Sequence, residues 1–362
     1  MTGAEKIRAE PLFRAWRAPE TVVTADGMTL SLVAYQARAA ALGGKLAHRL
    51  KRAGLFDQLE PGFRRRMEAE IVAAARIADI AKYELRLIEA ALAGFEGEVL
   101  LLKGAAYQNA GLRAGEGRLF GDIDILVSRS RLQDVEKAVI EAGWRFAKSN
   151  PYDDKYYREF MHELPPLEHG ETGGHLDIHH TISPPTSRVR IDAEKLIADS
   201  APLKGARWRL LSPEDMTIHA ALHLFHDGPV AGHLRELFDF ADLIEEFRAS
   251  PEFGPKLRAR AEMLDAGAIL DLALRMANEL LGARSDGAAP EGPARGMTAV
   301  LIRQVFRPPK PAPRRFPGTG RDIAAFLLYV RSHWRRMPPL MLGLHLLRKL
   351  FRRATPSRPG ET

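Results

Sequence analysis

The chain has 362 residues, of which 46% are hydrophobic and none is cysteine, and its formal charge is +7. This length and composition exclude a largely disordered chain and allow two or three compact units. The absence of cysteine excludes disulfides, thiolate nucleophiles and cysteine-ligated zinc, so a bound metal would need oxygen or imidazole ligands.

Residues 1–20 mix charged residues with prolines and lack the apolar stretch of a signal peptide, which predicts a cytoplasmic protein. Apolar residues at three- and four-residue spacing then predict helices over 30–52 and 62–95. Gly94 and Gly97 end the second helix. We therefore expect residues 1–96 to form a helical N-terminal region.

Residues 97–183 have the pattern of a small core of strands and helices. The predicted elements are a buried strand at 99–102, a turn at Lys103-Gly104, a helix at 105–110, a loop at 112–120, a strand at 121–127, a helix at 131–142, a strand at 144–147, and extended segments at 156–161 and 175–182 that form a hairpin. Strands that alternate with helices and end in a hairpin predict an α+β fold with a mixed sheet.

Residues 184–282 are expected to form a helical domain that packs beside this core. Pro184-Pro185 ends the core, and Ser212-Pro213 begins a helix with serine as N-cap and proline in the first turn. Helical patterns continue over 234–247 and 257–281. Residues 283–320 are rich in proline and glycine and are expected to be a linker.

Residues 321–362 are predicted to be a basic helical arm with short helices at 321–330 and 340–353. Residues 301–362 hold 14 Lys and Arg against two acidic residues, whereas residues 1–300 hold 39 against 44. The mixture of cationic, aromatic and aliphatic side chains suits an anionic membrane surface or nucleic acid, and the plain alternative is a solvated basic tail. We favour a general electrostatic role for this arm over a sequence-reading one. No apolar stretch reaches the roughly 18 residues of a transmembrane helix, so any attachment to a membrane would be peripheral.

The most informative stretch is Gly121-Asp122-Ile123-Asp124-Ile125-Leu126-Val127. Side chains alternate along a strand, so Asp122 and Asp124 point to one face while the isoleucines point to the other. Two adjacent carboxylates repel each other, and a cation between them removes that repulsion. Oxygen ligands of this kind suit Mg²⁺ or Mn²⁺. Gly121 leaves room for a ligand to approach the backbone.

The segment His175-Leu176-Asp177-Ile178-His179-His180 alternates in the same way. It places Asp177 and His179 on one face, and a third carboxylate on a neighbouring strand is what a two-metal site needs. His179 could orient a metal ligand, contact a phosphate, or act only as a hydrogen-bonded support.

Four segments together resemble the uncharacterised nucleotidyltransferase family of the polymerase-β-like superfamily, over about residues 62–247. They are Leu102-Lys103-Gly104, Arg118 with the strand at 121–127, Leu176-Asp177-Ile178-His179, and Ser212-Pro213-Glu214-Asp215 with the helix that carries His219 and His223. The resemblance implies a nucleotide-binding turn at Gly104 and Ala105 and two Mg²⁺ ions held by Asp122, Asp124 and Asp177. Ala105 stands where the superfamily has Ser or Gly, so its side chain offers no hydroxyl to a phosphate.

Lys103 and Arg118 fit the same picture as cations that neutralise phosphate charge. The alternative is structural: Lys103 extends its head group to solvent and Arg118 pairs with one of the aspartates.

A second polar cluster follows between residues 219 and 242. His219 and His223 are four residues apart, a spacing that puts both on one helix face and allows metal ligation. The neighbouring His226-Asp227 is similar to the histidine-aspartate phosphohydrolases, although those enzymes draw their ligands from separate helices. Structural histidines that line the cleft are the preferred interpretation, and contact with the substrate is the second. The other members of the cluster are His233, Asp239 and Asp242.

The sequence therefore predicts a Mg²⁺-dependent nucleotidyltransferase that moves an NMP group from an NTP to an acceptor hydroxyl by a two-metal mechanism. The acceptor could be a small molecule, a peptide or protein, or RNA. A non-catalytic relative that binds a nucleotide or a partner is the first alternative, and a metal phosphohydrolase that uses the histidines at 219–233 is the second.

Overall fold

The computed structural model describes residues 3–147, 157–158, 160–187, 189, 191–225, 233–288, 292–311 and 320–336. Its helices are α1 (Gly3–Arg8), α2 (Pro11–Arg17), α3 (Gly27–Ala39), α4 (Gly43–Arg52), α5 (Pro61–Ala91), α6 (Lys103–Asn109), α7 (Leu132–Glu141), α9 (Ala193–Ala198), α10 (Pro213–Phe225), α11 (Leu234–Phe247), α12 (Phe253–Met263), α13 (Gly267–Leu281), α14 (Met297–Val305) and α15 (Gly320–Arg336). Its strands are β1 (Leu100–Leu101), β2 (Asp122–Leu126), β3 (Trp144–Phe146), β4 (Leu167–His169), β5 (His175–His179), β6 (Ala201–Pro202) and β7 (Arg209–Leu210).

The strands form one mixed sheet in the order β3-β4-β5-β2-β1-β7-β6. β2 lies at its centre, parallel to β5 and antiparallel to β1. The apolar side chains of β2 and β5 are buried because they alternate with the polar ones. The α+β fold with a mixed-sheet core between helical units is therefore confirmed.

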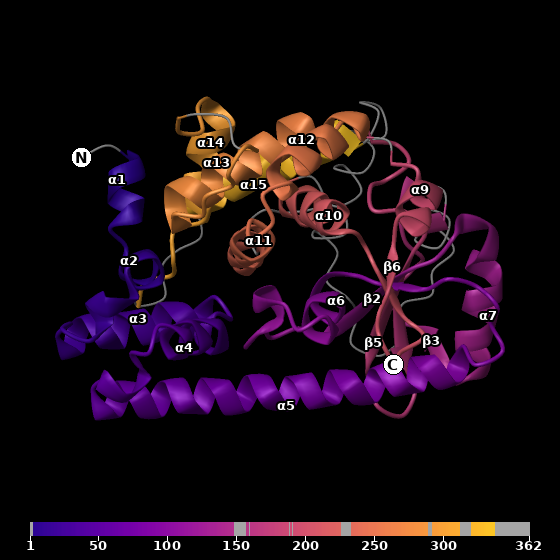
Figure 1. The fold of residues 1–362 in the computed structure, drawn as a ribbon, viewed down its shortest axis with the longest axis horizontal. Helices are drawn as coiled ribbons and strands as arrows, with labels where there is room; N and C mark the ends of the chain where they lie inside the picture. Colours follow the sequence, from indigo (N-terminus) through magenta and orange to yellow (C-terminus); the bar gives the residue numbers. More distant parts are fainter. Residues whose placement is uncertain are drawn as a thin grey trace, which may run out of the picture.

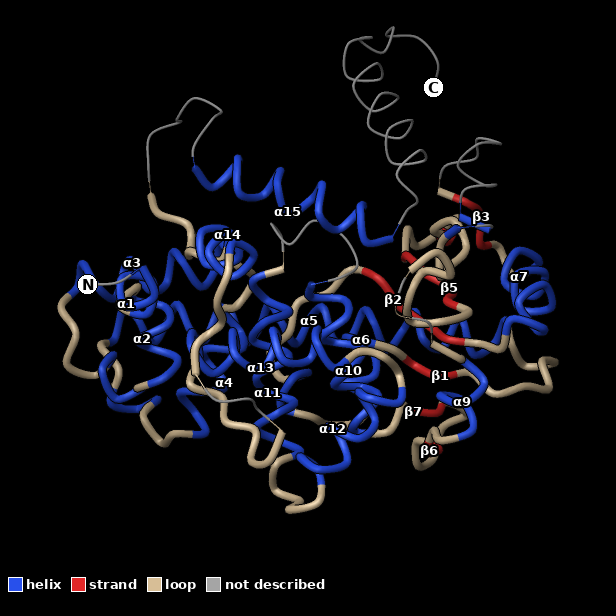
Figure 2. Tube along the Cα trace, turned by 90° about the horizontal axis from the view of Figure 1, so that it is seen from above, coloured by secondary structure: helices blue, strands red, loops and turns tan. Residues whose placement is uncertain are grey.

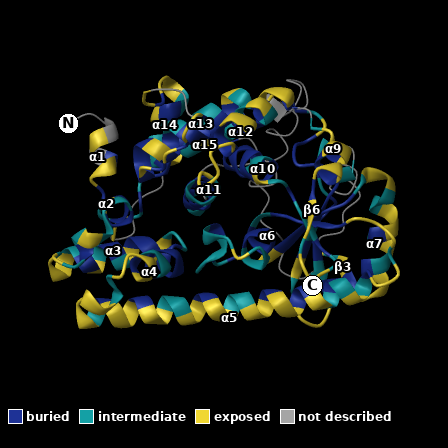
Figure 3. Ribbon diagram, viewed as in Figure 1, coloured by how far each residue is buried: buried dark blue, intermediate teal, exposed yellow. Residues whose placement is uncertain are grey.

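Helix α5 connects the N-terminal helices to the sheet. Its 31 residues span about 46 Å at the α-helical rise, and it runs beneath both α4 and the sheet (Figure 1). It packs on α3 and α4 as well as on β2 and α7, and its outer side is exposed (Figure 3). Because of these contacts, buried side chains from the N-terminal helices, the sheet and the C-terminal helices form one hydrophobic cluster.

Two helical predictions divide further in the structure, and one predicted extended segment needs correction. The pattern over 30–52 forms two helices, because the chain turns at Ala41, whose φ is 55°. The pattern over 257–281 likewise forms α12 and α13, with Asp265 at φ 52° between them. The segment predicted to be extended at 156–161 is helical at residues 157, 158 and 160 and bends at 161, which are its described residues.

The antiparallel partner of β5 is therefore β4, which follows the predicted segment in the chain. The sequence gives little indication of a positive φ at a residue other than glycine, such as Ala41 or Asp265. It gives equally little indication of a strand as short as β4.

Other predictions agree with the structure. Ser212 caps α10, since its Oγ accepts a hydrogen bond from the Asp215 N–H at 3.1 Å. Helix α15 extends beyond the predicted 321–330 to Arg336. The predicted helix at 340–353 lies outside the described residues. No helix in the described part of the chain is long and apolar enough to cross a membrane.

Candidate functional site

Three carboxylates converge at the centre of the sheet. The register pairs Asp124 of β2 with Asp177 of β5, and Asp122 lies two residues before Asp124 on the same face. One oxygen of each carboxylate lies within 4.8 Å of the others. Convergence follows from the parallel register, because in-register residues on neighbouring strands project side by side.

The electrostatics of this acidic trio (Asp122, Asp124 and Asp177) are those of crowded, poorly solvated carboxylates. Burial and the charges of Asp124 and Glu163 raise the pKa of Asp177 to about 7. Desolvation and the Asp124 charge also raise the pKa of Asp122. Both carboxyl groups therefore resist ionisation, and a cation would relieve the repulsion.

Asp124 differs because two side chains hold it in the charged form. The Lys103 Nζ lies 2.6 Å from its Oδ1, and the His179 Nε2 lies 3.0 Å from the same oxygen. Burial alone would raise the pKa of Asp124, but Lys103 and His179 hold it well below its usual range. The carboxylate is thus fixed through Oδ1 and has its second oxygen to offer to a ligand.

Two residues beside His179 were not identified from the sequence. The Glu163 Oε2 lies 3.5 Å from the His179 Nε2, and the His162 Nε2 lies 3.9 Å from the same Glu163 oxygen. Burial alone would lower the pKa of His179, yet its hydrogen bond to Asp124 and the Glu163 charge raise it. Glu163 reaches His179 through an isolated β-bridge to β5, so no local motif could have revealed the contact.

The turn between β1 and α6 has the predicted residues but an unexpected conformation. Lys103 is the residue with positive φ, at 44°. Gly104 is required because a Cβ there would overlap the Arg118 guanidinium and press on Phe120. Ala105 is 1% exposed and packs in the core. Gly121 has open space around it.

Arg118 pairs with an aspartate outside the trio. Its Nε lies 2.8 Å from the Asp239 Oδ2, on α11. Lys45 of α4 binds the other oxygen of Asp239 at 3.0 Å and Asp242 at 2.7 Å. The side chains of this network are at most 5% exposed. Burial alone would lower the pKa of Arg118, but Asp239 raises it, so Arg118 stays charged.

Two histidines of the second cluster, His223 and His233, lie side by side at a hollow. His223 lines a hollow between α6 and the α10–α11 pair and stacks on His233, with ring centroids 5.1 Å apart. His219 is 2% exposed. His226 and Asp227 lie outside the described residues. The hollow is lined by Lys103, Tyr107, Arg118, Ala220, His223, Glu236 and Asp239.

Within the described residues, two groups of side chains could each hold a metal: the acidic trio and His162-Glu163-His179. Neither group includes His219, His223 or His233.

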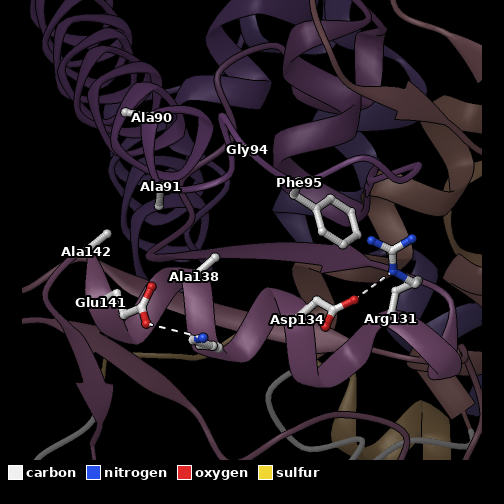
Figure 4. A pocket seen from close by; sticks show the side chains of 10 residues that line it. Ala90, Ala91, Gly94, Phe95, Arg131, Asp134, Ala138, Glu141 and Ala142 are labelled. Atoms are coloured by element: carbon white, nitrogen blue, oxygen red, sulfur yellow. Dashed lines mark hydrogen bonds and ion pairs between the residues drawn. The ribbon is translucent and has the colours of Figure 1, made fainter.

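A larger hollow, of about 560 Å³, lies between the end of α5 and α7. Figure 4 shows Arg131 directed toward Asp134, beside Phe95. Lys137 pairs with Glu141 at 3.8 Å. The lining charges are thus paired with one another, and none of the trio lines this hollow.

Comparison with known proteins places the chain in a family. A search of curated proteins and a search of solved structures found no match. A family model, described as an uncharacterised nucleotidyltransferase, matches residues 27–282, which include the sheet, the acidic trio and helices α10 to α13. The match covers more than half of the chain, and the chain therefore belongs to this uncharacterised nucleotidyltransferase family.

Proposed function

We propose that this protein is a Mg²⁺-dependent nucleotidyltransferase that transfers the NMP group of an NTP to an acceptor hydroxyl. The observation that carries the proposal is the convergence of Asp122, Asp124 and Asp177 on one face of the sheet. The family match supports the same reaction class.

The donor set fits Mg²⁺ or Mn²⁺. Asp122, Asp124 and Asp177 offer oxygen ligands only, which these hard cations prefer. The raised pKa values of Asp122 and Asp177 are what uncompensated carboxylates show. When bound, such ions stabilise the negative charge that develops on the transferred phosphate.

The side chains around the trio have separate roles in this proposal. Lys103 and His179 fix Asp124, so that its free oxygen is held in place. Asp177 would help to hold the ion and would accept the proton of the acceptor hydroxyl. The hydroxyl oxygen then bonds to the α-phosphorus, the bond from that phosphorus to the β-phosphate oxygen breaks, and pyrophosphate leaves.

We place the nucleotide beside the turn of Lys103, Gly104 and Ala105, near Arg118 and Gly121. Lys103, Arg118 and His223 line the same narrow hollow, of about 10 Å³, so the two cations would neutralise a triphosphate bound beside this hollow rather than inside it. His179 would act as a support, since its Nε2 lies 3.0 Å from the Asp124 Oδ1, and we give the buried His219 the same role. Acceptors that present the required hydroxyl are small molecules, peptide or protein side chains, and RNA ends.

A non-catalytic relative is the second candidate, and two observations favour it. Ala105 offers no hydroxyl to a phosphate, and Lys103 already provides a positive charge at Asp124. Such a protein would bind an NTP without turning it over.

The test uses α-labelled NTPs with Mg²⁺ and an extract of the source cells as acceptor. We expect label transfer by the intact protein and a loss of about 10³-fold or more in Asp177→Asn and Asp122→Ala. Glu141→Gln, on the exposed side of α7, is the matched control. Unchanged transfer in both aspartate variants would overturn the proposal. Mg²⁺-dependent NTP binding without transfer would select the non-catalytic relative.

A further inference from the structure

Helix α15 carries an apolar stripe on its solvent side. Ile323, Phe326, Leu327 and Trp334 are 56%, 60%, 45% and 55% exposed. Together with the half-buried Val330 they recur at spacings of three, one, three and four residues. At 100° per residue these five side chains fall within about a third of the helix circumference. We call them the outer stripe.

The outer stripe is distinct from the face that holds α15 on the protein. Ala324, Leu328 and Ser332 are buried and lie on the opposite side of the helix, against α14. Figure 2 shows α15 along one edge of the molecule. An amphipathic helix of a globular protein normally turns its apolar stripe to the core. Here the helix packs through Ala324, Leu328 and Ser332 and leaves the apolar side chains of the outer stripe exposed or half-buried.

Charge indicates what the stripe contacts. Residues 301–362 hold 14 basic and two acidic residues, whereas residues 1–300 carry a net negative charge. The positive charge is thus concentrated in the part of the sequence that carries the outer stripe. The residues that follow, 340–353, repeat the same mixture of leucine, arginine and lysine.

We propose that the outer stripe binds the surface of an anionic lipid bilayer, with α15 lying parallel to the membrane plane. Exposed aliphatic and aromatic side chains on a helix within a basic segment are what interfacial helices use: the apolar side chains enter the acyl boundary, and the cations meet anionic head groups. Tryptophan favours this interface because its ring is amphipathic. A nucleic acid would match the charge but would leave the stripe in water.

The four tryptophans give a direct experiment on the full-length protein. Trp16, Trp144 and Trp208 are at most 4% exposed, whereas Trp334 is 55% exposed. An aqueous quencher such as acrylamide should therefore report mainly on Trp334. Vesicles that contain phosphatidylglycerol should protect Trp334 from quenching and shift its emission to the blue. Neutral phosphatidylcholine vesicles should bind the protein at least about tenfold more weakly.

Two variants locate the contact. Phe326→Ser with Leu327→Ser should weaken vesicle binding by about tenfold or more. Val72→Ser with Ile80→Ser removes two exposed apolar side chains from α5 instead, and it should bind vesicles like the unaltered protein. Circular dichroism and thermal unfolding confirm that both variants are folded.

Other outcomes would overturn the proposal. Equal binding to neutral and anionic vesicles would show that the basic residues do not contribute to binding. Binding to duplex DNA or RNA that shields Trp334, without vesicle binding, would identify a nucleic-acid surface. Shielding of Trp334 that depends on protein concentration alone would identify a second copy of the chain as the partner.

Discussion

Asp124 shows how a single buried carboxylate can be held in its charged form. It is 3% exposed, and its Oδ1 is shared by Lys103 and His179. A buried charge without a partner is strongly unfavourable, so we expect Lys103 and His179 to stabilise the folded state as well as to position Asp124. The Lys103 ammonium balances the negative charge of Asp124, as a metal ion bound from solution would.

Lys103→Met should therefore lower the free energy of unfolding by about 3 kcal/mol in metal-free buffer. Saturating Mg²⁺ should restore part of this loss, because a cation bound at the trio would compensate Asp124 and stabilise the folded state. Urea unfolding with and without Mg²⁺ measures both effects. Lys82→Met, at an exposed lysine of α5, should change stability little. A Lys103→Met variant as stable as the parent would contradict this account.

His180, which is not part of the acidic trio, should make the stability of the fold depend on pH in the acid range. Burial and the nearby charges of Arg129 and His162 lower its pKa to about 4. The unfolded chain, with an ordinary histidine pKa near 6.5, binds this proton more readily than the folded chain does. His180 thus stabilises the fold fully above pH 6.5, and this contribution is lost as the pH falls from about 6.5 to 4.

His180→Gln should flatten the pH dependence of stability in that window, by at most about 3 kcal/mol at 1.36 kcal/mol per pKa unit. Glutamine can still donate a hydrogen bond to the Met161 carbonyl, which His180 contacts at 3.2 Å. Thermal unfolding between pH 4 and 7 measures the effect. His175→Gln, at the exposed start of β5, should reproduce the parent profile. If His180→Gln has the same dependence of stability on pH as the parent, then groups other than His180 cause the loss of stability in acid.

At the scale of elements, close packing of glycines sets the position of α4. A Cβ on Gly44 would overlap the Gly117 carbonyl, and Gly117 itself has a φ of 64°. This contact brings α4 against the loop that carries Arg118. It also explains why the pattern over 30–52 is interrupted, since a continuous helix would direct Gly44 elsewhere.

Gly44→Ala should destabilise the protein by about 3 kcal/mol, because the overlap is with backbone atoms that cannot rotate away. Gly267→Ala is the matched control at the start of α13, where a Cβ has open space. Alanine there should stabilise by up to about 1 kcal/mol through its helix propensity. Urea unfolding of both variants compares them. Equal effects would show that the packing of α4 is looser than the structure indicates.

At the scale of the whole molecule, one buried network connects three parts of the chain. Lys45 comes from the N-terminal helices, Asp239 and Asp242 come from α11, and Arg118 comes from the loop before β2. Lys45 also donates a hydrogen bond to the Ala114 carbonyl at 2.9 Å. The network fixes Arg118 beside the proposed nucleotide site.

Lys45→Met should cost about 3 to 5 kcal/mol, because it leaves two buried carboxylates without their shared cation. The loss should appear as a lower urea midpoint for the whole chain, since the network joins its N- and C-terminal helices. Lys195→Met, on the exposed side of α9, is the control. A variant that loses only the N-terminal helices would show that the two ends unfold separately.

The sequence by itself determined the local features. Alternation in Asp122–Leu126 and in His175–His179 assigned the carboxylates to one face, because side chains on a strand have a period of two. Ser212 and Pro213 marked the start of α10 through capping chemistry. The motifs around Gly104, Asp122 and Asp177 were sufficient to indicate the family that the comparison then showed.

Only the tertiary structure decided the contacts between distant residues. It paired Asp124 with Asp177, brought Glu163 to His179, gave Arg118 its partner Asp239, and left the outer stripe of α15 facing solvent. These relations depend on strand register and on how helices pack. Both are set by the sum of many weak contacts over the whole chain, and no short stretch of sequence contains that sum.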